Sequence, residues 1–169
     1  QAATFVNTQT VADLIPGQVR CLAVMSGQLW VGGAQGVTVV ELATLSRAAQ
    51  LPPENKVAGL LEFQSHMIAV YADGSVVIFD GQGKVKHSQP PFSAGPALCL
   101  AGLESGPRVI CGHARGQISS IALPEFQLRH SWPAAEQGSP VRCLCSARAD
   151  GIFILGAENG ELQVWQRDE

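Results

Sequence analysis

A short pattern of residues recurs four times along this chain of 169 residues, and it constrains the fold more than any single residue does. Each copy contains an apolar run, a turn that ends in glycine, an alternating apolar stretch and a polar gap. The turns lie at 34–36, 72–74, 114–116 and 158–160, so their glycines are 38, 42 and 44 residues apart. A chain of such repeats folds as a row of similar units, each of which buries its apolar side against the next.

Within each copy the pattern predicts short strands and no helix. The first strand is an almost continuous apolar run, at 19–24, 57–61, 97–101 and 141–145, as is typical of strands buried on both faces between sheets. Second strands are predicted at 29–32, 67–70, 109–112 and 152–155, and third strands at 37–40, 75–79, 117–121 and 161–165. A more polar fourth strand is predicted at 45–49, 84–88 and 126–130, where charge keeps an outer edge soluble.

Short strands that repeat about every 40 residues are the signature of β-propeller blades. We therefore expect an all-β fold, a β-propeller of four four-stranded blades. The blades are expected at about 17–53, 54–91, 95–133 and 139–169, and residues 4–14 are expected to form an outer strand that precedes them. Four blades could form a small closed ring, half of a paired assembly, or part of a larger ring.

Two segments resemble the WD-repeat family of propellers. Residues 73–80 (Asp-Gly-Ser-Val-Val-Ile-Phe-Asp) and 159–166 (Asn-Gly-Glu-Leu-Gln-Val-Trp-Gln) are similar to that family's turn, third strand and terminal aromatic–acid pair. The family's Gly-His pair before the first strand is absent from all four copies, so we expect apolar packing to replace its His–Ser–Asp–Trp bracing. The resemblance implies binding through loops at one face, and a ring of about seven blades of which this chain is part.

Composition excludes several classes of partner. The net charge is −3 and the basic residues are scattered, which argues against nucleic acid. No apolar run reaches the roughly 18–20 residues of a membrane span, so no membrane insertion is expected. The chain starts at Gln1 without a signal-peptide pattern, and we expect a soluble piece of a longer protein. Cys21, Cys99 and Cys143 fall at equivalent positions of three repeats, which favours reduced core cysteines and a cytoplasmic location over disulfides.

The sequence predicts no catalytic, metal or cofactor site. The four histidines, at positions 66, 87, 113 and 130, are too widely spaced to suggest a metal site, and structural or solvated roles are expected. Cys143 and Cys145 share one strand face and are interpreted as packing residues. Nucleophile-elbow, phosphate-loop and zinc-protease motifs are absent. Ser119 and Ser120 lie in mid-strand, and the aspartates lie in turns, where carboxylates usually cap turn amides.

Three residues are candidates for binding a protein partner. Arg20 and Arg142 occupy equivalent second positions of their first strands, where both could line the channel entrance. The alternative is that their side chains cover contacts between blades. Trp132 lies in a joint between blades, and Trp and Arg are common interface anchors. The alternative for Trp132 is packing on its own blade.

The preferred function is a non-catalytic protein-interaction module, or scaffold, in a larger intracellular protein of several domains. It would bind its partner through the loop face of the propeller. One alternative is a homotypic dimerisation module formed by partial propellers, because exposed edges of an incomplete ring favour pairing between chains. Another is an enzyme or cofactor-binding propeller of the quinoprotein type, which residues 80–85 (Asp-Gly-Gln-Gly-Lys-Val) faintly resemble.

Overall fold

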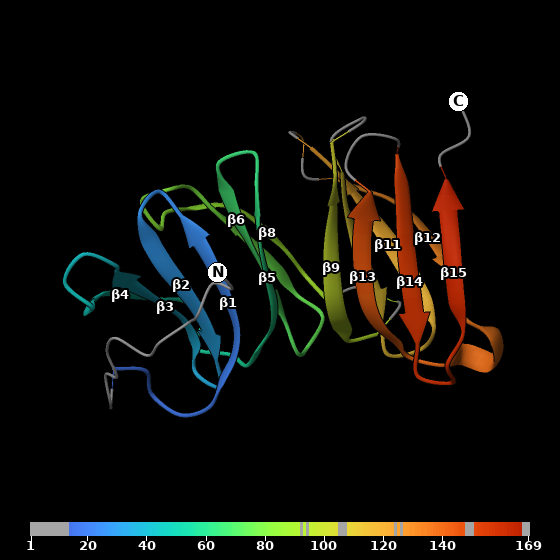
Figure 1. Cartoon of the computed structure of the whole chain (residues 1–169), viewed down its shortest axis with the longest axis horizontal. Coiled ribbons are helices and arrows are strands. Elements are labelled where there is room, and N and C mark those ends of the chain that lie inside the picture. The colour runs from blue at the N-terminus through green and yellow to red at the C-terminus, as the bar shows by residue number, and fades with distance from the viewer. Residues whose placement is uncertain are drawn as a thin grey trace, which may run out of the picture.

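A computed structural model describes residues 14–91, 93, 95–104, 108–123, 125, 127–147 and 151–166. They form four antiparallel sheets, and the one helical element among them is the short 3₁₀ turn η1 (Glu136–Gly138) (Figure 1). The predicted all-β class is therefore confirmed. No helix in this part of the chain has the length and apolar character needed to cross a membrane.

The sheets follow one another along the chain, and each is numbered in that order. Sheet 1 contains β1 (Val19–Met25), β2 (Gln28–Gly33), β3 (Gly36–Glu41) and β4 (Ser46–Leu51). Sheet 2 contains β5 (Val57–Phe63), β6 (His66–Tyr71), β7 (Val76–Phe79) and β8 (Val85–Gln89). Sheet 3 contains β9 (Ala97–Leu103), β10 (Arg108–His113), β11 (Gln117–Ala122) and β12 (Gln127–Pro133). Sheet 4 contains β13 (Val141–Ala147), β14 (Ile152–Ala157) and β15 (Leu162–Gln166).

Each of these strands coincides with a predicted strand, and the ends differ by no more than three residues. Four four-stranded units were expected, whereas the described part of sheet 4 has three strands. Residues 4–13 of the expected outer strand 4–14 lie outside the described residues, and Leu14 is in a bend.

The core consists of three apolar layers, each between two successive sheets. Trp30 of sheet 1 is packed with Met67 and Phe79 of sheet 2, and all three are fully buried. Similar clusters join sheets 2 and 3 around Ile68, and sheets 3 and 4 around Ile118. In this arrangement the first strands β1, β5, β9 and β13 lie side by side as the inner strands of the four sheets.

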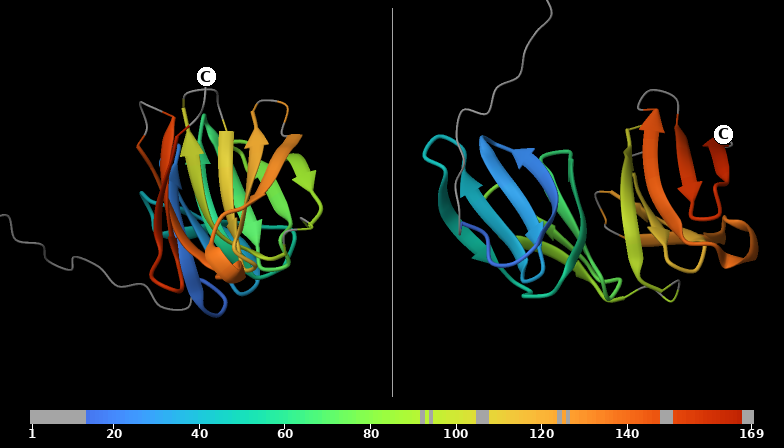
Figure 2. Two further views of the ribbon diagram at one scale, coloured as in Figure 1. Left: turned by 90° about the vertical axis from the view of Figure 1, so that its right-hand side faces the viewer. Right: turned by 60° about the horizontal axis from the view of Figure 1, so that its bottom comes forward.

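The described sheets do not close into a ring. Sheets 1 and 4 lie at the two ends of the row, with sheets 2 and 3 between them (Figures 1 and 2). The prediction that every first strand is buried on both faces is therefore wrong for β1 and β13. Leu22 and Val24 on β1 are 59% and 58% exposed, and Cys143 and Cys145 on β13 are exposed, because no further sheet covers them.

In sheets 2, 3 and 4, hydrogen bonds hold the turn after the second strand against the segment that precedes the first strand of the same sheet. The backbone amides of Ala72, Ala114 and Glu158 donate to carbonyls of that segment at 2.8–2.9 Å. In sheet 2, Asn55 also donates from Nδ2 to the Asp73 carboxylate at 2.8 Å. These bonds therefore fix the turn of each of these three sheets beside the start of its first strand.

Candidate functional site

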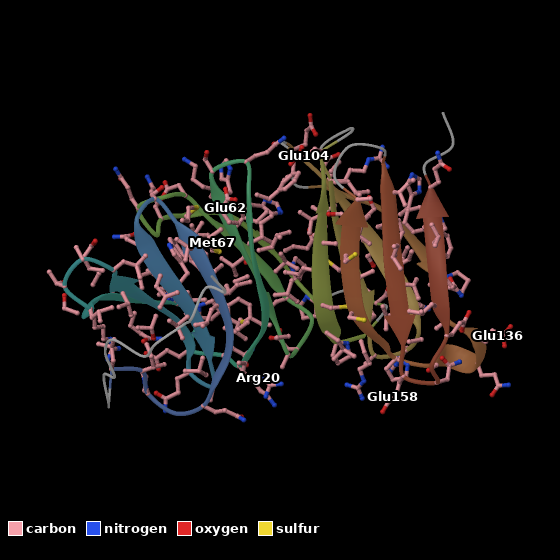
Figure 3. The ribbon with its side chains drawn as sticks, in the orientation of Figure 1. Arg20, Glu62, Met67, Glu104, Glu136 and Glu158 are labelled. Atoms are coloured by element: carbon pink, nitrogen blue, oxygen red, sulfur yellow. The ribbon has the colours of Figure 1, made fainter. Side chains whose placement is uncertain are left out.

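The inner strands present two ends with different chemistry (Figure 3). Arg20 and Arg142 follow the starts of β1 and β13, and Glu158 lies at the same end; we call this the Arg end. Glu62 and Glu104 lie at the opposite end, where β5 and β9 finish; we call this the Glu end.

At the Arg end, the pairing of each inner strand with its neighbour shifts register at the second residue. The residues at these shifts are Arg20, Ala58, Leu98 and Arg142. A β-bulge redirects a side chain out of the regular alternation. The two arginines therefore occupy equivalent bulges, and both are exposed.

The structure does not bring Arg20 and Arg142 together. Arg142 donates from Nη2 to Glu158 Oε2 at 2.8 Å, and both side chains are about half exposed, so the ion pair contributes only about 0–1 kcal/mol to stability. Arg20 belongs to sheet 1 and Arg142 to sheet 4, so sheets 2 and 3 separate them. A partner that engages both would have to cross the whole row.

Trp132 lies on sheet 3 and packs in the layer between sheets 3 and 4. It lies on β12, the outermost strand of sheet 3, opposite Ile118. Its side chain is half-buried against the apolar cluster between sheets 3 and 4, and the His130 ring lies 5.4 Å away between centroids. Because β12 is three strands away from β9, Trp132 lies on the outer rim rather than beside the inner strands.

A cavity of about 430 Å³ opens at the Glu end, in a region that the sequence analysis did not select. Its walls are the ends of the inner strands of three successive sheets: Leu61 to Gln64 from β5 and its turn, Gly102 and Glu104 from β9 and its turn, and Ser146 from β13. Gly102 makes room for the Phe63 ring, since a Cβ atom at position 102 would lie 2.5 Å from Phe63 Cδ2. The volume falls in the usual range for ligand pockets.

The described part of the cavity lining is anionic. Glu62 and Glu104 are both exposed at its rim, and no Lys or Arg lines it among the described residues. Glu62 accepts a hydrogen bond from the Ser65 amide at 3.2 Å, which holds this carboxylate on the β5–β6 turn. Such a lining favours a cationic or hydrogen-bond-donating group. In the sequence, this cavity is marked only by an acidic residue at the end of two successive apolar strands. That pattern indicates a site only once the strands are known to lie side by side.

The histidines and cysteines form no metal-binding group of three or more acidic, His or Cys residues within the described part of the chain. His113 is fully buried, which agrees with the structural one of the two roles, structural or solvated, that were expected for the histidines. Its Nδ1–H donates to the Gly95 carbonyl at 2.9 Å, so Nε2 accepts from the Ser119 hydroxyl at 2.8 Å. Burial lowers the pKa of His113, although the bond to Gly95 opposes this shift.

The aspartates that the structure describes in turns cap backbone amides, as predicted. Asp73 Oδ1 accepts from the amide and hydroxyl of Ser75, and Asp80 Oδ1 accepts from the amides of Gln82 and Lys84. Burial opposes ionisation of Asp73, but its hydrogen bonds from Ser75 and Asn55 prevail and lower its pKa. Asp13 and Asp150 lie outside the described residues. These carboxylates therefore stabilise turns.

No family model and no curated protein matches this chain. Solved structures with a similar fold include two computationally designed proteins. The crystal structure of the designed protein Ika4 matches with a TM-score of 0.79 and 21% identity over 92% of this chain and 95% of Ika4. The designed protein Ika8 matches with a TM-score of 0.75 and 22% identity over 88% of this chain but only 46% of Ika8. At such identities the likeness shows the fold alone.

Proposed function

We propose that this chain is a non-catalytic protein-interaction module, built as a divergent WD-repeat-like part of a β-propeller, and that it binds a segment of a partner protein in the cavity at the Glu end. The observation that carries the proposal is the cavity itself. It lies where the inner strands of three successive sheets end, so its walls are held by sheet hydrogen bonding and by the apolar layers between sheets.

Rigid walls favour binding because little ordering entropy is lost when a partner docks. The side chain best matched to this cavity is an arginine or lysine. Its aliphatic stem would contact Phe63 and Leu61, and its charged end would meet Glu62 and Glu104. The partner class is therefore a basic segment of a protein.

A short arginine peptide tests this assignment. We expect Ac-Ala-Arg-Ala-NH₂ to shift the amide NMR signals of Leu61, Gln64 and Ser146, and the matched citrulline peptide, which has no charge, to shift them less. The double variant Glu62→Gln/Glu104→Gln should lose most of the difference. Glu136→Gln, which changes an exposed carboxylate away from the cavity, is the matched control and should keep it. Equal responses to both peptides, or shifts spread over the whole surface, would refute the proposal.

A further inference from the structure

Sheet 4 has an uncovered apolar face where the other sheets have a buried one. Leu162 and Val164 on β15 are 78% and 71% exposed. The residues at the position of Leu162 in the other three sheets, identified by strand register, are Val37, Val76 and Ile118, and each is 0% exposed. Leu162 therefore has the character of a residue that a following sheet would cover. We call the face of sheet 4 turned away from sheet 3 its open face.

Sheet 1 has a matching open face, turned away from sheet 2. Since Cys21, Ala23 and Met25 pack toward sheet 2, the alternate residues of β1 point the other way. These include Leu22 and Val24, which are more than half exposed. The equivalent leucines of the other inner strands pack against the layers between sheets: Leu60, Leu100 and Leu144. On the same face, Val31 on β2 and Val40 on β3 are already buried in the single chain. The uncovered part of this face is therefore β1.

The existing junctions between sheets show what these open faces are built to receive. In sheet 3, Cys99 lies opposite Gly112, and the first residue of the next inner strand, Val141, fills the space above that glycine. A Cβ atom on Gly112 would lie 2.6 Å from Val141 Cγ1, and Cys99 Sγ lies 3.5 Å from the Val141 carbonyl oxygen.

The other two junctions follow the same rule. In sheet 1 the glycine is Gly32, and Val57 fills the space, with its Cγ1 2.7 Å from where a Cβ on Gly32 would lie. In sheet 2 a valine, Val70, replaces the glycine, and the next inner strand begins with the smaller Ala97, which packs in the same cluster. A glycine on one sheet is thus paired with a valine on the next, and a valine with an alanine.

The chain carries both halves of a further junction of this kind. On the open face of sheet 4, Cys143 lies opposite Gly156, so the rule calls for a valine. On sheet 1 the equivalent first residue of the inner strand is Val19, which is 46% exposed, whereas Val57 and Val141 are 0% exposed. The positions of the two open faces on β1, β13, β14 and β15 contain no charged side chain, so docking these strands would bury no charge. Arg47 on β4, opposite Val40, is the charged residue at the outer edge of this face of sheet 1.

We propose that two copies of this chain close into one ring of eight sheets, with Val19 of each copy seated on the Cys143–Gly156 pair of the other. The two halves of the junction lie at opposite ends of the row, so a second copy can supply each of them (Figure 1). A two-fold axis closes such a ring with two equal junctions. Eight sheets also lie at the upper end of the range of about 4–8 for propellers, whereas three copies would exceed it. This assembly is independent of binding at the Glu end.

Light scattering across a range of concentrations tests the stoichiometry. The chain has a mass of 17.8 kDa, and we expect twice that mass for the unmutated protein. Leu162→Glu places a charge at the centre of the junction and should yield monomers with an unchanged circular dichroism spectrum, because this side chain is exposed in the single chain. Leu128→Glu, which changes a 40% exposed leucine on β12, is the matched control and should stay dimeric.

A cross-link tests the predicted contact directly. In the variant Val19→Cys, mild oxidation with copper phenanthroline should join the thiol introduced into one copy to Cys143 of the other and give a covalent dimer on a non-reducing gel. Adding Cys143→Ser should abolish that band. The proposal is overturned if the unmutated protein is a monomer, if Leu162→Glu leaves the dimer intact, if the cross-link does not form, or if the chain assembles into open polymers of no fixed size.

Discussion

Cys99 and Gly112 face each other on neighbouring strands, and the cysteine sulfur occupies the space that a side chain at position 112 would need. A Cβ atom there would lie 2.7 Å from Cys99 Sγ and 2.6 Å from Val141 Cγ1. The need for glycine at this position therefore comes from packing between three strands rather than from the backbone angle. The same relationship at Gly32 and Gly156 makes it a repeated feature of this fold.

The first prediction concerns this packing. Gly112→Ala should lower the free energy of unfolding by about 1–3 kcal/mol, because overpacking displaces Cys99 and Val141. The double variant Gly112→Ala/Val141→Ala should be less destabilised than the sum of the single changes, since it reproduces the small-against-large arrangement of Val70 and Ala97. Urea denaturation measures each free energy.

Gly81→Ala is the control for that series. A Cβ atom at position 81 would meet only Ser26 Oγ at 3.5 Å, an ordinary contact, so the change should stay within about 0.5 kcal/mol. Additive effects of the Gly112 and Val141 substitutions would contradict the packing argument.

The second prediction concerns the reactivity of the thiols. Burial raises the pKa of Cys99 to about 12 and raises that of Cys111 as well, whereas Cys143 and Cys145 are exposed on the open face of sheet 4. In the Leu162→Glu variant, iodoacetamide at neutral pH should therefore modify Cys143 and Cys145 first, as read by peptide mass spectrometry. In the unmutated protein the same two thiols should react several-fold more slowly, because a second copy covers them. Equal rates in both proteins would count against that coverage.

The third prediction concerns the Arg end. If a partner docks across the exposed bulges, Arg20→Glu/Arg142→Glu should weaken capture of that partner while thermal stability changes little, since the ion pair between Arg142 and Glu158 is half exposed. Glu158→Gln removes the ion pair but keeps both arginines. It therefore shows whether weaker capture comes from the lost arginine charges or from the broken ion pair. Unchanged capture by the arginine variant would assign binding to the Glu end or elsewhere.

The strands were predictable from sequence because their signals are local. Alternating apolar residues indicate each strand, and turns such as 73–74 and 159–160 indicate where strands end. Every described strand lies where this pattern places it. Local signals could not decide whether the row closes, so the sequence left a small closed ring, half of a paired assembly and part of a larger ring as alternatives. Whether sheet 4 meets sheet 1 depends on contacts between residues such as Val19 and Gly156, which are far apart in the sequence and have no local signature.

The candidate site was predicted only in part. Equivalent positions for Arg20 and Arg142 follow directly from the repeat, and the register shifts show that both lie on bulges. The cavity at the Glu end was missed because it is formed by side chains from three sheets, and neither Glu62 nor Glu104 is distinctive alone. The hydrogen bonds around His113 were missed for a similar reason, because its partners Gly95 and Ser119 lie on separate segments.

The last prediction follows from the buried imidazole of His113. Its pKa is lowered by burial in the folded protein, whereas in the unfolded chain it titrates at about 6.5. As the pH falls below about 6.5, the unfolded chain takes up a proton that the folded protein does not, so stability falls with decreasing pH until the lowered folded pKa is reached. The urea midpoint should therefore drop between pH 7.5 and 5.5.

His113→Gln should be less stable at pH 7.5 by about 1–3 kcal/mol, because it disturbs the bonds to Gly95 and Ser119, yet its midpoint should depend less on pH in this window. If His113→Gln showed the same slope with pH, His113 would not be the source of the effect.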